Sequence, residues 1–128
     1  MKFELQSAYL LHRRPYRESS LIAEVFTREA GRTGLVVKGA RRARSPLRPL
    51  LQPFVPLWLS WSGRHELGTL TGAEPRGIVA PMPPQMVMVG LYVNELLMRL
   101  VHRHDPHPAL FDAYAYAVEH LREATAYA

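Results

Sequence analysis

The apolar residues of this chain follow one spacing before residue 80 and another after residue 84. The segment between them reads Ala80-Pro81-Met82-Pro83-Pro84. Closely spaced prolines end strands and helices alike, because proline fixes φ and has no backbone donor. The change predicts two parts, a β domain over residues 1–80 and the start of an α-helical domain over residues 81–128.

Five segments before the break have strand character, with β-branched and aromatic residues between turn residues. They are Glu4–His12, Leu21–Thr27, Gly34–Lys38, Phe54–Ser62 and Glu66–Thr71. We expect Arg13-Arg14-Pro15 to end the first strand, Gly31 to supply the positive φ of a hairpin turn, and Pro56 to mark an edge or a bulge. Five short strands without a helical period predict an all-β OB-fold, a small five-stranded barrel.

Two basic segments lie within the predicted barrel. Residues 38–48 carry five cations in eleven residues, four of them arginines, and residues 13–17 form a second basic turn. The stretch up to Leu51 shows no hydrophobic period, which predicts a long exposed loop. No acidic residue lies between Glu29 and Glu66. Because a guanidinium matches the oxygens of a phosphate, both segments are candidate polyanion contacts; the alternative is a solvated loop that only aids solubility.

The charge of the whole chain supports the same interpretation. Residues 1–80 hold 13 Lys/Arg and 6 Asp/Glu, whereas residues 81–128 hold 3 and 5, and the formal net charge is +5. Cations that neutralise phosphates release condensed counterions, so nucleic acid is the first candidate partner and an anionic membrane the second. Nothing in the basic segments is expected to read base edges, so binding should follow backbone charge more than sequence.

Aromatic residues near the cations are candidates for stacking on bases. Tyr16 lies inside the basic turn and is the best of them. Trp58 and Trp61 are three residues apart, so they point to opposite faces of a strand and only one of them belongs to the core. The remaining aromatics of the barrel are expected in the core, namely Tyr9, Phe26 and Phe54.

Several classes of site are disfavoured. The chain has no cysteine, so we expect neither disulfides nor thiolate zinc ligands, and His102, His104 and His107 make a poor zinc set without them. Phosphate-loop, dinucleotide, serine-hydrolase and metalloprotease motifs are missing. The N-terminal residues lack the apolar stretch of a signal peptide, and polar residues interrupt the apolar run of residues 86–100. We therefore expect a cytoplasmic protein without a cofactor that is not an enzyme.

The second part has helical spacing. From Gln85 to Val101 apolar residues cover most of a helical wheel, which predicts a helix buried on most sides, and Glu95, Arg99 and His102 form its one polar stripe. Asp105 is the expected cap of a second helix, with Pro106 in its first turn. The expected buried face of that helix consists of Leu110, Tyr114, Val118 and Leu121.

The order of these motifs resembles the RecO family of bacterial recombination mediators, in the form found in proteobacteria. The resemblance rests on Tyr9–Ser20, Val25-Phe26-Thr27, Gly31-Arg32, Val37–Arg41, Leu51–Phe54, Gly72-Ala73-Glu74 and Gly90–Leu97. It covers essentially the whole chain, and the linked set is specific although each piece alone is weak.

The resemblance implies an N-terminal OB-fold and a helical domain that together bind single- and double-stranded DNA. It implies annealing of complementary strands, cooperation with RecR, binding of the C-terminal tail of single-strand-binding protein, and indirect help to RecA in the RecF pathway of repair after DNA damage. A cytoplasmic, nucleoid-associated location without membrane contact follows from that role. The candidate DNA contacts are Arg13, Arg14, Tyr16, Arg17, Arg32, Lys38, Arg41, Arg42, Arg44 and Arg48.

This sequence differs from the RecO pattern in two respects, and one alternative function stays open. Family members continue past the point where this sequence ends, so we expect an incomplete tail-binding site and an apolar helix face at Tyr92, Leu96 and Leu100 that invites oligomerisation or marks a fragment. Some relatives hold zinc through cysteines in the helical domain, and none is expected here. The alternative function is an adaptor that docks acidic peptides on the same cations without direct action on DNA.

Overall fold

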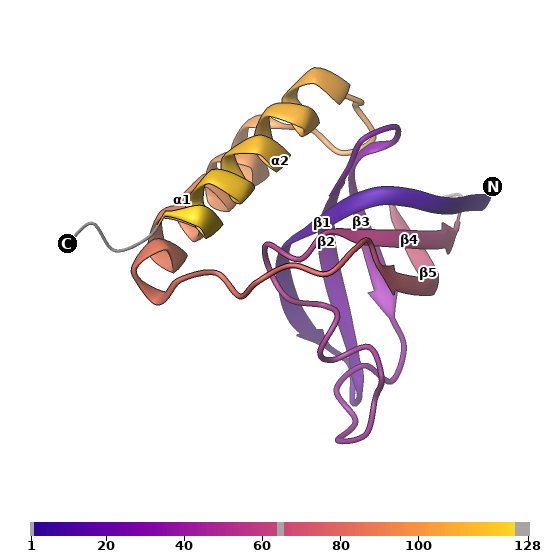
Figure 1. Ribbon diagram of the computed structural model, residues 1–128. Coiled ribbons are helices and arrows are strands. Elements are labelled where there is room, and N and C mark those ends of the chain that lie inside the picture. The colour runs from indigo at the N-terminus through magenta and orange to yellow at the C-terminus, as the bar shows by residue number, and fades with distance from the viewer. Residues whose placement is uncertain (1, 64–65, 125–128) are drawn as a thin grey trace.

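The computed structural model describes residues 2–63 and 66–124, which form a five-stranded barrel followed by two helices (Figure 1). The elements are β1 (Lys2–Tyr16), β2 (Ser20–Thr27), β3 (Gly31–Val37), β4 (Leu57–Ser62), β5 (Leu67–Pro75), α1 (Pro84–Leu100) and α2 (Pro108–Glu123). The strands close in the order β1-β2-β3-β5-β4, and only β3 and β5 pair in parallel. The expected OB-type barrel is confirmed.

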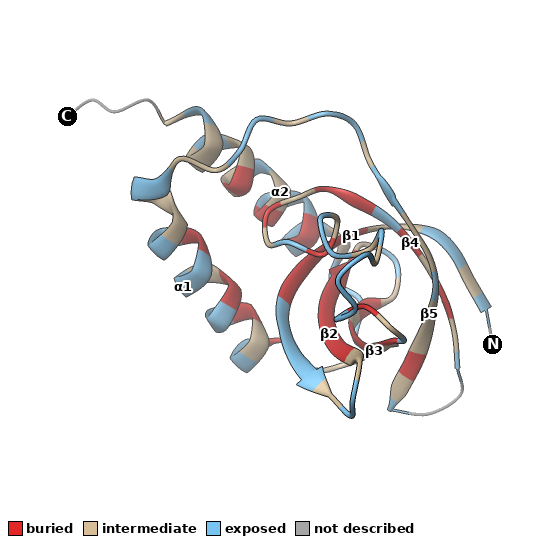
Figure 2. Cartoon of the chain, turned by 90° about the horizontal axis from the view of Figure 1, so that it is seen from below, coloured by how far each residue is buried: buried red, intermediate tan, exposed pale blue. Residues whose placement is uncertain are grey.

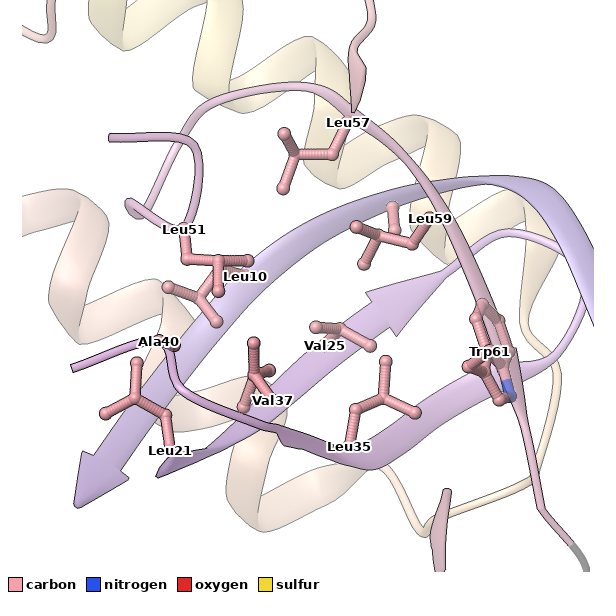
Figure 3. Packing of buried hydrophobic residues seen from close by; sticks show 12 residues of the cluster. Leu10, Leu21, Val25, Leu35, Val37, Ala40, Leu51, Leu57, Leu59 and Trp61 are labelled. Atoms are coloured by element: carbon pink, nitrogen blue, oxygen red, sulfur yellow. The ribbon is translucent and has the colours of Figure 1, made fainter. Parts of the chain in front are cut away.

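The interior of the barrel is filled by aliphatic side chains from all its walls (Figure 3). Leu57 and Leu59 point inward from β4, and Trp61 stacks on Phe3 with ring centres 4.7 Å apart. Trp61 is 3% exposed and Trp58 is 37% exposed, so the prediction that only one tryptophan belongs to the core is confirmed.

Four strands have boundaries that differ from the sequence prediction by more than one residue. Strand β1 does not end at Arg13 but continues to Tyr16, pairing with β2 alone over its last four residues. Pro15 is tolerated there because its other edge has no strand to receive an N–H donor. Strand β3 starts at Gly31 instead of Gly34, since Thr27 pairs with Gly31 directly after the turn, and Gly31 has the expected positive φ of 75°. Strand β4 begins just after Pro56, and β5 extends to Pro75.

The two helices cover the outer face of β1 and β2 (Figure 2). Tyr9 and Phe26 extend outward from the barrel and meet Phe111 and Tyr114 of α2, with ring centres 5.2 to 6.1 Å apart. The three aromatics expected in the core (Tyr9, Phe26 and Phe54) are all buried. Gly90 of α1 lies against the ring of Phe54, where a Cβ atom would come within 2.5 Å of the ring carbons.

The helices differ from the sequence prediction in three respects. Helix α1 is not buried on most sides: only Gly90, Asn94 and Leu97 are buried. Val93 and Met98 pack partly against the core, whereas Met88 is exposed, and so is the apolar face at Tyr92, Leu96 and Leu100 that we expected to lack cover. Helix α2 begins at Pro108 with His107 in the N-cap position, so Asp105 is not its cap. Its buried residues are Phe111, Tyr114 and Val118, whereas Leu110 is exposed because it lies one position off that face.

An ionic joint fastens the barrel to the segment between the helices. We give this name to Glu24, Arg32 and Arg103. The carboxylate of Glu24 is buried and accepts hydrogen bonds from both guanidinium groups, at 2.7 Å from Arg32 Nη1. The hydrogen bond to Glu24 raises the pKa of Arg103 above its ordinary value. Backbone pairing supports the joint, since Arg32 O accepts a hydrogen bond from the N–H of His104 at 2.8 Å.

Two further polar contacts hold the helices. Tyr114 donates a hydrogen bond to Asn94 Oδ1 at 2.6 Å, in the buried contact between α2 and α1. Burial raises the pKa of the Tyr114 hydroxyl above its ordinary value of 10.0. On the surface, Arg28 forms a two-pronged ion pair with Asp112 at 2.9 and 3.0 Å, and this hydrogen bonding lowers the pKa of Asp112 below its ordinary value.

Candidate nucleic-acid interface

The two basic segments of the sequence meet at one end of the barrel. The turn between β1 and β2 lies against the loop between β3 and β4, at the lower end in Figure 1. The backbone N–H of Arg41 donates to Ser19 O at 2.9 Å, and Arg41 Nη1 donates to Arg17 O at 3.0 Å. Residues separated by more than twenty positions therefore form one continuous surface.

The loop that carries most of the cations has a defined shape. Ala40 and Leu51, near its two ends, are fully buried, and Leu47 and Leu50 pack partly against the barrel core. Between these anchors successive turns are closed by backbone hydrogen bonds, such as Ser45 N to Arg42 O at 3.1 Å. The expected long loop is thus exposed at its cations, whereas its leucines fasten it to the barrel core.

The cations of both segments are exposed to solvent. We call them the basic surface, defined as Arg13, Arg14, Arg17, Lys38, Arg41, Arg42, Arg44 and Arg48. None of them forms an ion pair with an acidic side chain in the described part of the chain. Neither segment contains an acidic residue, and Glu18 directly follows the first of them. The end of the barrel therefore carries a strong, uncompensated positive charge.

Two side chains at the edge of this surface have specific contacts. Arg13 Nη1 donates to Leu51 O at 2.7 Å, which ties the β1–β2 hairpin to the end of the loop. The guanidinium of Arg17 lies 4.9 Å from the ring centre of Tyr16, which is half-buried. A cation over an aromatic ring is a favourable arrangement that also fixes the ring. Tyr16 thus remains beside the cations, with Arg17 covering part of its ring.

Arg32 does not join the basic surface, although it was a candidate contact. Its guanidinium belongs to the ionic joint, where it binds Glu24 and donates to Val101 O at 2.8 Å. A cation held by a buried carboxylate is not available to a phosphate. We therefore leave Arg32 out of the interface.

Sequence reasoning also missed one cation that lies close to an exposed ring. The Arg76 guanidinium is 5.6 Å from the ring centre of Trp58 and 5.4 Å from that of Tyr9. No local signal marks Arg76, because it follows Pro75 outside both basic segments and its aromatic neighbours are far away in the sequence.

The described residues show neither a metal site nor a membrane-spanning helix. Within residues 2–63 and 66–124 no three His, Cys, Asp or Glu side chains gather closely enough to hold an ion. Among the same residues no helix is long and apolar enough to cross a bilayer.

Comparison with known proteins finds related sequences over nearly the whole chain. Family models described as "Recombination protein O N terminal" and "Recombination protein O C terminal" match residues 1–79 and 84–128. The DNA repair protein RecO of Nitrosococcus oceani is 52% identical over 124 residues, and that of Nitrosospira multiformis is 51% identical over 124 residues. Each alignment covers 97% of this chain, but 50% and 51% of the respective relative. The chain spans about half the length of these curated relatives.

Proposed function

Because the chain belongs to the RecO family, we propose that it binds single- and double-stranded DNA through the basic surface and serves DNA repair as a recombination mediator. It acts by binding and not by catalysing a reaction. The observation that carries this proposal is the junction of the two basic segments, where Arg41 binds the turn at Arg17 and Ser19. Eight exposed cations lie there, and none has an acidic partner among the residues that the structure describes.

The electrostatics explain how such a surface could promote annealing. Two DNA strands repel each other through their phosphates, and a protein that neutralises both backbones lowers this barrier to pairing. Each phosphate contact also releases counterions, which provides affinity independent of base sequence. A broad end of a barrel with cations on two segments suits this role better than a narrow groove, since it leaves base edges free to pair.

The remaining family roles are extended to this chain as part of the proposal. They are cooperation with RecR, binding of the C-terminal tail of single-strand-binding protein, and assistance to RecA on coated DNA, in the cytoplasm at the nucleoid. The sequence and fold of the family support these partners. The basic surface supports the DNA contact itself, because it lies on the part of the chain matched by the N-terminal family model.

The proposal is tested by removing three cations whose side chains make no hydrogen bond in the described structure. In the variant R42A/R44A/R48A we expect single-strand affinity to fall at least tenfold at moderate salt, measured by fluorescence anisotropy of a labelled oligonucleotide. The matched control is R99A, which removes an exposed cation from α1 that is paired with Glu95 at 2.9 Å. Equal affinity of the triple variant and the wild type would refute the proposal.

A competition experiment separates DNA binding from the adaptor alternative. The same oligonucleotide is displaced with an acidic peptide of equal charge. We expect displacement only at a large excess of peptide, because a peptide has a lower charge density than DNA. Displacement at equimolar peptide would favour the adaptor.

A further inference from the structure

We propose that Trp58, backed by Arg76, is a stacking site for an unpaired base, at which single-stranded DNA continues from the basic surface along β4. This inference rests on the proposed function and adds a contact that the cations alone do not provide. The ligand at this position is single-stranded DNA and not duplex DNA.

The first observation is the orientation of Trp58. Its neighbours Leu57 and Leu59 point into the barrel, so Trp58 points outward and is 37% exposed. A single exposed aromatic residue is common on protein surfaces, so the neighbours of Trp58 decide whether its ring can meet a ligand. An indole ring offers a flat face on which any base can stack, and such contacts are insensitive to base identity.

The second observation is the support that Arg76 gives to this ring. Its backbone N–H donates to Pro56 O at 2.9 Å and its Nε donates to Leu57 O at 3.4 Å, so the guanidinium is held beside the start of β4. One terminal nitrogen, Nη2, is buried without a hydrogen-bond partner. Arg76 forms no ion pair with an acidic residue in the described part of the chain. The buried Nη2 cannot itself contact a ligand, but the positive charge of this half-buried residue has no acidic partner among the described residues and can attract the phosphate next to a stacked base.

The third observation is the path from the basic surface to Trp58. The end of the β3–β4 loop runs beside β1, with Leu51 bound to Arg13 and Pro53 bridged to Leu10. Trp58 follows this segment and pairs with Ser7 of β1. Six residues of strand separate Ser7 from Arg13, or about 20 Å. Single OB-folds cover about 4–16 nucleotides, so one strand can reach both places.

One acidic neighbour sets the direction of the phosphates. Glu74 pairs with Trp58 from β5 and is exposed. Its negative charge repels a phosphate, whereas Arg76, two residues further along the chain, attracts one. The strand should thus place its backbone toward Arg76.

Tryptophan fluorescence tests the proposal, because Trp61 is buried and Trp58 is the tryptophan that a base can reach. Oligo(dT) is added to the wild type and to W58F, and binding is followed separately by anisotropy of labelled oligo(dT). We expect the oligonucleotide to quench the wild type and to leave the emission of W58F nearly unchanged. A duplex of the same length should bind without comparable quenching, since its bases are already stacked on one another.

Affinity provides the second readout. W58A should bind oligo(dT) roughly fivefold to a hundredfold more weakly, in line with the usual effect of one base–aromatic stack, and bind duplex DNA as the wild type does. The control is Y92A, which removes an exposed ring from α1. Oligo(dT) that binds with no quenching and with equal affinity for W58A would overturn the stacking site while leaving the proposed function intact. Failure of the wild type to bind oligo(dT) at all would overturn both.

Discussion

The arginines at the two ends of the barrel have opposite surroundings. At the end that faces the segment between the helices, Arg32 and Arg103 share the buried carboxylate of Glu24, and Arg28 pairs with Asp112. At the other end, the cations of the basic surface have no acidic partner among the described residues. Arginines thus serve two purposes, holding the fold together at one end of the barrel and offering charge to a ligand at the other, and only their partners distinguish the two.

The contrast follows from the cost of burying a charge. A cation removed from water must regain hydrogen bonds and an opposite charge, so the arginines of the ionic joint are paired. An exposed cation keeps its hydration and costs little in stability, so it can remain unpaired until a phosphate arrives. An unpaired cation on the surface is therefore a better indicator of a polyanion ligand than a buried cation with an acidic partner.

Mutations in the ionic joint should lower the free energy of unfolding more than mutations in the basic surface. Replacing Glu24 with alanine leaves two partly buried guanidinium groups without their shared anion, and we expect a loss of about 3–5 kcal/mol in the free energy of unfolding. Chemical denaturation measures this loss. DNA affinity of the folded variant should stay within twofold of the wild type. A large loss of affinity with little loss of stability would mean that the two ends are not separate in function.

The buried contact between the helices should respond next. In Y114F, Asn94 loses its hydrogen-bonded partner, and we expect a loss of about 1–3 kcal/mol in the free energy of unfolding. The raised pKa of Tyr114 means that the unfolded chain releases this proton more readily than the folded chain. Stability from this group should thus be intact below pH 10 and decline as the pH rises above it. Denaturation at pH 8 and pH 11 checks whether Y114F loses part of this alkaline sensitivity.

The exposed pair of Arg28 and Asp112 should have the smallest effect. The pKa of Asp112 is lowered by its hydrogen bonds to Arg28, so its contribution is present at neutral pH and is lost as the pH falls below its ordinary value of 3.8. We expect D112N to be slightly less stable than the wild type at pH 7, with a smaller difference at pH 2.5. A difference of undiminished size at pH 2.5 would assign the effect to packing and not to the ion pair.

The sequence was sufficient to predict the barrel and the position of the basic surface. Strand character and glycine turns are local signals, and so is a run of five cations without acids. The contact between the loop and the turn at residues 17–19 could not be predicted from the sequence. Arg41 reaches its partners there only because the barrel closes.

Other features could not be predicted because they depend on contacts between distant residues. Arg32 looks like any arginine after a turn, and only the approach of Arg103 and the burial of Glu24 show that it belongs to the ionic joint. The apolar spacing of α1 predicts burial on most sides, but spacing does not tell which neighbours are present; the face at Tyr92, Leu96 and Leu100 is exposed, as expected.

The salt dependence of DNA binding tests the central claim most directly. The logarithm of the association constant is plotted against the logarithm of salt concentration for the wild type and R42A/R44A/R48A, with single-stranded DNA. If these arginines contact phosphates, three lost contacts should make the slope shallower by about two units, at roughly 0.7 per phosphate. Parallel lines for the two proteins would show that the DNA lies elsewhere and would contradict the assignment of the basic surface.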